Sequence, residues 1–152
     1  MSWMTRALRY YRSMYSIHHV ALSVSNQTIS VAFYQKLGFK QVHFWEANDK
    51  SLSITHLRLE DFILELFCYK HFTSAPATIH ATATDLPIIG TKHFGLRVNS
   101  IEAARKDLAN KGIVAEDTPI NQGRTGPRYL FIEDPDGILV EIMEDKRDFW
   151  NE

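Results

Sequence analysis

The sequence predicts an α+β protein that is built from two successive β-α-β-β-β modules. A strand pattern that begins at His19 recurs from His93, 74 positions later, and Gly38 and Gly112 are separated by the same interval. Each glycine follows a stretch whose apolar residues recur at helical spacing, as a helix-ending glycine does. Alternating apolar strands close each module, most clearly over residues 129–144. A repeated supersecondary unit accounts for all of these observations.

The composition is that of an ordinary globular chain. It has 152 residues, 45% of them hydrophobic, and its net charge of −1 argues against nucleic-acid binding as the main role. Cys68 is the single cysteine, so neither an intrachain disulfide nor a cysteine-based metal cluster can form. No stretch has the length and apolar character of a membrane span. We therefore expect a cytoplasmic protein.

One domain is expected over residues 16–144, with its two modules at 16–70 and 91–144. An arginine-containing, acid-free N-terminal extension precedes it at 1–15, and a charged C-terminal tail follows it at 145–152. These boundaries fall where alternating apolar segments give way to charged or Thr- and Ala-rich sequence.

The first module is expected to contain a strand, a helix and then three more strands. Ser25 or Asn26 is a suitable N-cap for the helix, and Gly38 ends it. The expected strands are residues 16–24, 39–45, 51–58 and 61–69. Residues 71–90, which are rich in Thr and Ala and contain two prolines, are interpreted as a linker.

The second module repeats this order. Asn99 is the expected N-cap, with Glu102 three residues later in a capping-box arrangement, and Gly112 ends the helix. The expected strands are residues 91–98, 113–116 and the two strands of the hairpin at 129–144. The sequence DPDG at 134–137 predicts the hairpin turn, because proline fixes φ and glycine accepts a positive φ.

A glutamate lies in the middle of the last strand of each module. Glu65 and Glu141 are 76 positions apart, and the even difference from the 74-residue interval keeps both side chains on the same face. With His19 and His93, each module then presents one imidazole and one carboxylate, a donor set that suits a first-row divalent cation. Singly, each glutamate fits an exposed strand position and each histidine an ordinary strand residue, as the neighbouring His18 illustrates. Their matched places in the repeat favour a metal site.

The sequence resembles the vicinal oxygen chelate superfamily, which includes glyoxalase I, fosfomycin-resistance transferases, extradiol dioxygenases, epimerases and bleomycin-binding proteins. The segments that carry the resemblance are IHHVALSV at 17–24, AFYQKLGF at 32–39, LELF at 64–67, KHFGLRV at 92–98 and FIEDPDGILVEIME at 131–144. It implies a glyoxalase-like fold, in which the two modules form a curled mixed sheet around a metal site.

The resemblance also implies roles for single residues. His19, Glu65, His93 and Glu141 are expected to bind one divalent ion per site, either nickel, zinc, iron or manganese. The order His, Glu, His, Glu is most similar to glyoxalase I, or lactoylglutathione lyase. The expected substrate is a hemithioacetal of methylglyoxal with glutathione or another thiol, and the product is a 2-hydroxyacyl thioester. Glu141 and Glu65 are the expected catalytic carboxylates, because a carboxylate released from the metal can move a proton.

Two other classes of function stay open from the sequence. One is a different enzyme of the superfamily, either a dioxygenase or a thiol transferase of the fosfomycin type. The other is a non-catalytic protein that binds a small molecule or an antibiotic.

Two arginines flank the glycine-containing loop that precedes the hairpin. Arg124 and Arg128 are expected to bind an anionic part of the substrate, since guanidinium groups pair well with carboxylates. A plain surface loop is the alternative.

Each module supplies only half of the expected ligands, so a complete site needs two modules. The resemblance implies a homodimer in which His19 and Glu65 of one chain meet His93 and Glu141 of the other. Pairing of the two modules within one chain, which the 71–90 linker permits, is the alternative.

Overall fold

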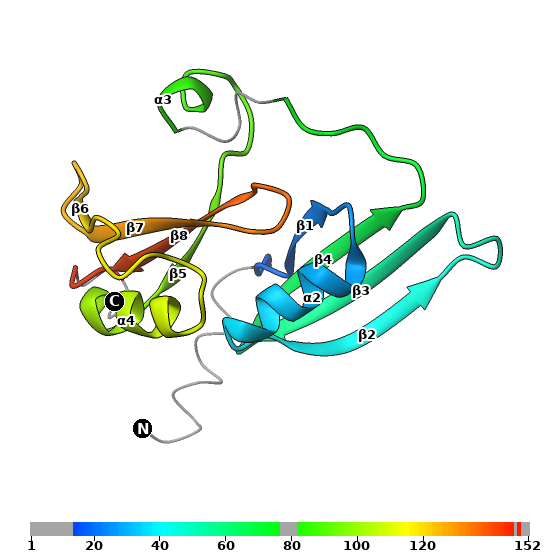
Figure 1. Ribbon diagram of the computed structural model, residues 1–152, viewed down its shortest axis with the longest axis horizontal. Helices are drawn as coiled ribbons and strands as arrows, with labels where there is room; N and C mark the ends of the chain where they lie inside the picture. The colour runs from blue at the N-terminus through cyan, green and yellow to red at the C-terminus, as the bar shows by residue number, and fades with distance from the viewer. Residues whose placement is uncertain (1–13, 77–81, 148, 150–152) are drawn as a thin grey trace.

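The computed structural model describes residues 14–76, 82–147 and 149, and it contains two four-stranded mixed sheets (Figure 1). The first sheet has the order β1-β4-β3-β2, and the second has the order β5-β8-β7-β6. The strands are β1 His19–Ser23, β2 Lys40–Glu46, β3 Leu52–Leu59, β4 Phe62–Tyr69, β5 Phe94–Arg97, β6 Asn121–Gln122, β7 Arg128–Glu133 and β8 Leu139–Glu144. The helices are α2 Gln27–Lys36, α3 Thr82–Asp85 and α4 Ile101–Asn110. The predicted α+β class with two β-α-β-β-β modules is confirmed.

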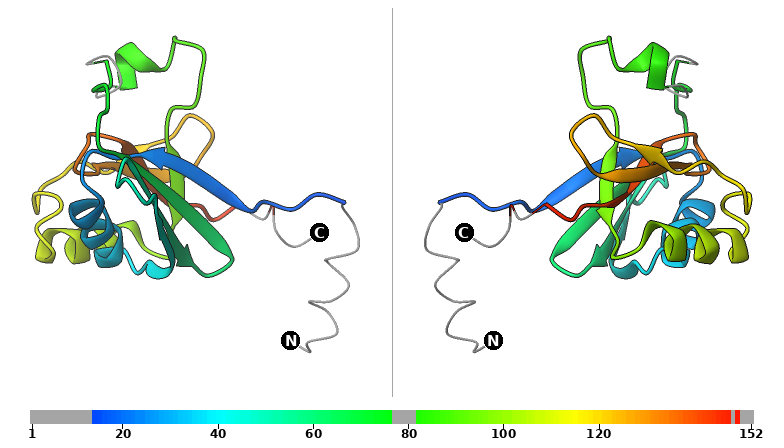
Figure 2. Two further views of the ribbon diagram at one scale, coloured as in Figure 1. Left: turned by 90° about the vertical axis from the view of Figure 1, so that its right-hand side faces the viewer. Right: turned by 90° about the vertical axis from the view of Figure 1, so that its left-hand side faces the viewer.

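The two sheets are built on one plan. The first strand of each module lies parallel to the last, as β1 beside β4 and β5 beside β8, and the remaining pairs are antiparallel. Figure 2 shows α2 and α4 on the same side of the two sheets. Successive strand residues point to opposite faces, so each sheet has one face toward its helix and one face away from it.

The faces toward the helices form one continuous hydrophobic core. Its buried strand residues are Leu57, Leu64 and Leu66 in the first sheet and Leu130, Ile132, Val140 and Ile142 in the second. The core crosses the boundary between modules, since the ring of Phe94 lies 6.0 Å from that of Phe62 and 6.4 Å from that of Tyr34. Glu65 and Glu141, one position removed from these core residues, therefore point away from the helices.

The helix ends follow the sequence with one correction. The Asn26 side chain caps α2 by accepting a hydrogen bond from the Ile29 amide, and Gly38 and Gly112 follow the two helices with φ of 98° and 68°. For α4 the predicted N-cap, Asn99, is wrong. Ser100 takes this position and accepts a hydrogen bond from the Ala103 amide, because the helix begins one residue later than expected.

The strand predicted over residues 113–116 is not formed. The Ile113 amide donates to the Leu108 carbonyl and the Thr118 amide donates to the Ala115 carbonyl, so turns following α4 satisfy the backbone locally. Ile113 and Val114 pack against the core, and the apolar run therefore reflects burial rather than sheet pairing. The edge of the second sheet is β6 instead, which pairs with Tyr129 and Arg128.

The predicted linker contains the one-turn helix α3. Asp85 at its end accepts an ion-paired hydrogen bond from Lys92 Nζ at 3.2 Å, which attaches the helix to the start of the second module. Residues 1–13 of the predicted N-terminal extension lie outside the described residues, as do residues 148 and 150–152 of the predicted C-terminal tail. In the part of the chain that the structure describes, the helices are too short or too polar to cross a membrane.

A buried hydrogen bond joins the two modules. Tyr34 on α2 donates its hydroxyl to Asp134 Oδ2 at 2.9 Å, and both residues are almost fully buried. Asp134 Oδ1 accepts from the amides of Asp136 and Ile138, so the same carboxylate closes the β7–β8 turn. The Ser25 amide adds a second link by donating to Asp136 Oδ2. Burial, with the neighbouring Asp134 charge, raises the pKa of the Tyr34 hydroxyl, which therefore stays protonated as a donor.

We expect Tyr34→Phe to lower the free energy of unfolding by about 1–3 kcal/mol, because the buried Asp134 carboxyl loses a hydrogen-bond donor. Urea denaturation followed by circular dichroism measures this change. Tyr69→Phe is the matched control, since Tyr69 is 47% exposed. An equal effect of the two substitutions would show that the Tyr34 hydroxyl contributes nothing specific to the contact between the two modules.

Candidate functional site

The first predicted ligand pair lies on the face of the first sheet that points away from α2. Ala21 on β1 is the register partner of Glu65 on β4, so His19, two residues earlier, projects from the same face. His19 Nε2 lies 3.6 Å from Glu65 Oε2. The structure thus brings together the two ligands that the sequence predicts for the first module.

The second pair repeats this arrangement. Gly95 on β5 is the register partner of Glu141 on β8, and His93 precedes Gly95 by two residues, as His19 precedes Ala21. His93 Nε2 lies 3.4 Å from Glu141 Oε2. The carboxylates are 19% and 15% exposed at the side chain, so each is partly shielded from water yet reachable.

Neighbouring rings orient the two histidines differently. His19 Nδ1 lies 2.9 Å from Nδ1 of His18, and one of these nitrogens must donate to the other. When His19 is the donor, its Nε2 keeps a free lone pair toward Glu65, which is the tautomer that a metal ligand needs. The His93 ring instead packs edge-on against Phe131, with centroids 5.1 Å apart. The contact of His18 with His19 was not predicted from the sequence.

The two pairs lie apart in the described part of the chain. Among residues 14–76, 82–147 and 149, no three histidine, cysteine, aspartate or glutamate side chains gather in a group that could hold a metal ion. Each sheet therefore carries half of the predicted ligand set on its own uncovered face.

His56 is a neighbour of Glu65 that the sequence reading overlooked. It lies opposite Glu65 in the register of β3 and β4, and its Nε2 is 2.8 Å from Glu65 Oε1. The tight turn at Glu60 and Asp61 indicates this pairing, because counting residues outward from the turn along both strands places His56 opposite Glu65. Recognising this needed the strand register as well as the strand positions.

The structure places Arg128 on the side of the second sheet that faces α4. Arg128 shares its face of β7 with the buried Leu130 and Ile132, opposite to the face that Glu141 occupies. Its guanidinium bonds to Glu102 on α4 and lies 3.7 Å from Glu144 Oε1. This arginine is held on the helix side of the second sheet.

Arg124 differs from Arg128 in its surroundings. It is exposed within the turn that joins β6 to β7, where the Gly123 amide donates to the Pro127 carbonyl and the Gly126 amide donates to the Gly123 carbonyl. The turn thus presents one cation to solvent on a locally hydrogen-bonded backbone.

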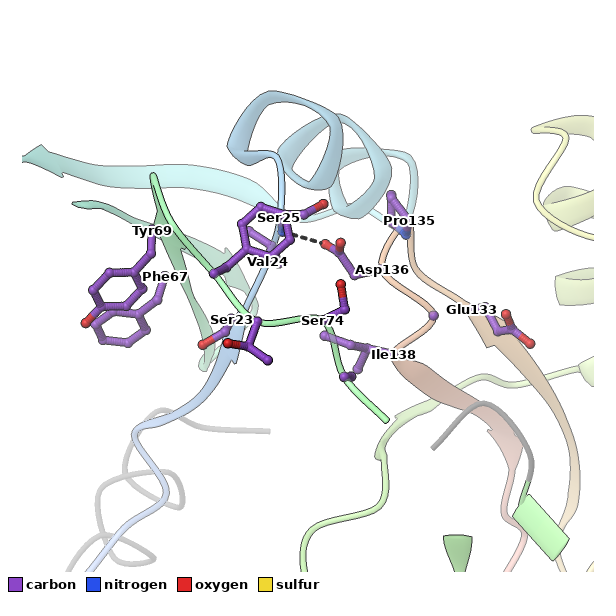
Figure 3. A pocket seen from close by; sticks show the side chains of 14 residues that line it. Ser23, Val24, Ser25, Phe67, Tyr69, Ser74, Glu133, Pro135, Asp136 and Ile138 are labelled. Atoms are coloured by element: carbon purple, nitrogen blue, oxygen red, sulfur yellow. Dashed lines mark hydrogen bonds between the residues drawn. The ribbon is translucent and has the colours of Figure 1, made fainter. Parts of the chain in front are cut away.

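A cavity of about 610 Å³ lies beyond Glu65 along β4, between the two modules (Figure 3). Phe67 and Tyr69 line one side, and Glu133 and Ile138 line the other. Phe67 and Tyr69 alternate with the core residues of β4 and so share the face of Glu65. None of the four predicted ligands lines this cavity, so it neighbours the candidate site without containing it.

Comparison with known proteins establishes the family. Residues 16–142 match the model of the Glyoxalase/Bleomycin resistance protein/Dioxygenase superfamily, and the chain belongs to this superfamily. An uncharacterized protein, YwkD, of Bacillus subtilis (strain 168) is 31% identical over 132 residues, which cover 85% of this chain and 96% of that protein.

Solved structures share the fold. A glyoxalase family protein from Enterococcus faecalis is 29% identical and superposes with a TM-score of 0.72, covering 89% of this chain and 99% of that one. The trypanothione-dependent glyoxalase I of Leishmania major is 21% identical with a TM-score of 0.61, over 87% of this chain and 88% of that one. At that identity the likeness concerns the fold alone.

We expect the contribution of Glu144 to the free energy of unfolding to vary with pH. Its carboxylate accepts from Lys146 Nζ and from the Ile101 amide at the start of α4, and these bonds hold the pKa of Glu144 below its ordinary value of 4.5. A depressed folded-state pKa gives stability that is present above the unfolded pKa and is lost as the pH falls through the folded one.

The stability advantage of the wild type over Glu144→Gln should therefore be largest near neutral pH and shrink below about pH 4.5. Urea denaturation between pH 3 and pH 7 measures it. Glu133→Gln, on an exposed carboxylate of the neighbouring strand, is the control. A pH-independent difference for Glu144→Gln would contradict the assignment of this carboxylate as a charged helix cap.

Proposed function

We propose that this chain is a metal-dependent lyase or isomerase of the glyoxalase I type. Its substrate would be a hemithioacetal of methylglyoxal with glutathione or another thiol, and its product a 2-hydroxyacyl thioester. One observation carries the proposal. Each sheet directs one imidazole Nε2 toward one carboxylate oxygen, His19 to Glu65 and His93 to Glu141, at equivalent places in the repeat.

The donor set fits a divalent ion. Two imidazoles and two carboxylates suit nickel, zinc, iron or manganese. The contact between the Nδ1 atoms of His18 and His19 is compatible with the ligand tautomer of His19, in which Nδ1 carries the proton. In our proposal His19, Glu65, His93 and Glu141 hold the ion. When bound, it would supply Lewis-acid stabilisation of negative charge on a substrate oxygen.

The two carboxylates supply the proton chemistry. The conversion is an isomerisation, in which a proton leaves the carbon that carries sulfur and arrives on the adjacent carbon. Glu141 or Glu65 takes this proton as a base and returns it as an acid, so the enzyme ends unchanged.

Side chains around the pairs suit such a substrate. Phe67 follows Glu65 by two residues on the same face of β4, and Phe131 lies opposite Glu141 on β7, so each carboxylate has an apolar neighbour. Arg124, exposed in its turn, is the cation that we propose for an anionic thiol cosubstrate. Arg128, whose guanidinium pairs with Glu102, stays a prediction for the same role.

We further propose that the complete site is shared between the chains of a homodimer. His19 and Glu65 of one chain would meet His93 and Glu141 of the other. The separation of the two pairs within the described part of one chain supports this arrangement. Exposed apolar residues on the edge strand β2 support a protein partner as well, since Val42, Phe44 and Trp45 are 48%, 49% and 48% exposed.

His93→Ala should leave the protein folded and lower both its metal content and its turnover of a methylglyoxal hemithioacetal. Elemental analysis of the purified protein, paired with an assay of thioester formation, measures both. His71→Ala, which changes an exposed histidine of the linker, should leave both unchanged. Full metal occupancy in His93→Ala would remove His93 from the ligand set, and a wild type that binds metal but forms no thioester would reject the proposed reaction.

Mixing inactive His19→Ala with inactive His93→Ala tests the shared site. After random subunit exchange, about half of the dimers are mixed, and one of the two sites in each of these has all four ligands, so about a quarter of the wild-type activity should return. Exchange is verified by mass spectrometry of differently tagged chains. Absence of recovery despite complete exchange would instead support sites formed within one chain.

A further inference from the structure

The two carboxylates of the candidate site face different cross-strand neighbours. Glu65 on β4 is the antiparallel register partner of His56 on β3, whereas Glu141 on β8 is the partner of Phe131 on β7. Positions 56 and 131 are equivalent in the repeat, since each lies opposite the glutamate of its own module. The first module therefore places a hydrogen-bonding ring where the second module places a hydrocarbon one.

The two carboxylate oxygens of Glu65 have different partners. His56 Nε2 lies 2.8 Å from Oε1, while Oε2 faces His19 Nε2 at 3.6 Å. An ionised carboxylate can only accept hydrogen bonds, so Nε2 of His56 is the donor. One oxygen is held by the protein and the other is left on the side of the proposed metal ligand His19.

The backbone around this bond is well fixed. Strands β3 and β4 are the two inner strands of the first sheet and stay in register from Leu52 opposite Tyr69 to Leu59 opposite Phe62. The His56 and Glu65 side chains are 30% and 19% exposed, and a hydrogen bond that is partly withdrawn from water orients its partners more strongly than a solvated one. Phe131 offers Glu141 no such donor, which leaves Glu141 the freer carboxylate.

We propose that His56 is a positioning residue that fixes the Glu65 carboxylate with Oε2 presented to the metal ion. This inference rests on the proposed metal site and adds a residue to it. Removal of a hydrogen bond to a ligating carboxylate typically costs about 10–100-fold in metal affinity, and the same loss is expected here. The effect comes from the N–H group, so a side chain that restores the donor should restore the affinity.

Metal titration of the purified full-length protein tests this role without reference to turnover. Nickel or cobalt is titrated in competition with a chromophoric chelator, and the visible spectrum of the cobalt form reports the ligand geometry. His56→Phe reproduces the arrangement of the second module, His56→Ala removes the ring, and His56→Gln retains an N–H donor near the position of Nε2. His43→Gln is the matched control, because the His43 ring lies 5.4 Å from that of His56 on the adjacent strand β2.

We expect His56→Phe and His56→Ala to bind metal about 10–100-fold more weakly with an altered cobalt spectrum, and His56→Gln and His43→Gln to resemble the wild type. Circular dichroism identifies which variants are folded. A folded His56→Phe or a folded His56→Ala is enough for the test. Unchanged affinity and spectrum in a folded His56→Phe or His56→Ala would overturn the inference. A folded His56→Gln as weak as these variants would do the same. A wild type that binds no metal would reject the proposed metal site itself, and the inference with it.

Discussion

The arrangement of the two modules depends on the buried carboxylate of Asp134. One oxygen accepts the Tyr34 hydroxyl from the first module, and the other accepts two amides of its own turn in the second. A buried carboxyl is costly unless it is hydrogen-bonded, and here the donors come from helix α2 and from the turn between β7 and β8. The same group therefore shapes the hairpin and locates it against α2, which sets how the two uncovered sheet faces lie relative to the shared core.

Strand alternation then separates stability from chemistry. In both sheets one set of alternate residues forms the core beneath the helices, while the other set carries the histidines, the glutamates and nearby aromatic rings. A polar group on the core face needs a partner there, as Arg128 has in Glu102 and Glu144. The uncovered faces have no such restriction, so they can hold titratable side chains at no cost to packing.

The duplicated modules have not remained equivalent. His18 contacts the first histidine, whereas Phe131 packs on the second, and His56 holds one carboxylate where Phe131 flanks the other. A site assembled from one half of each kind would have a firmly held carboxylate and a freer one. Such asymmetry is useful to a reaction in which one group must stay in place while another exchanges a proton.

The sequence by itself determined the α+β class, the two modules, the helices α2 and α4 with their glycine ends, and the DPDG turn, because these features depend on local backbone preferences and on residue periodicity. It also singled out the two His–Glu pairs, since an internal repeat exposes matched positions. Tertiary structure alone decided which side chains meet. The hydrogen bond between His56 and Glu65 depends on strand register. The pairing of Arg128 with Glu102 depends on which face of β7 meets α4. The hydrogen bond between Tyr34 and Asp134 connects residues 100 positions apart. Local sequence does not encode such contacts, because they arise only after the sheets have paired and the helices have packed against them.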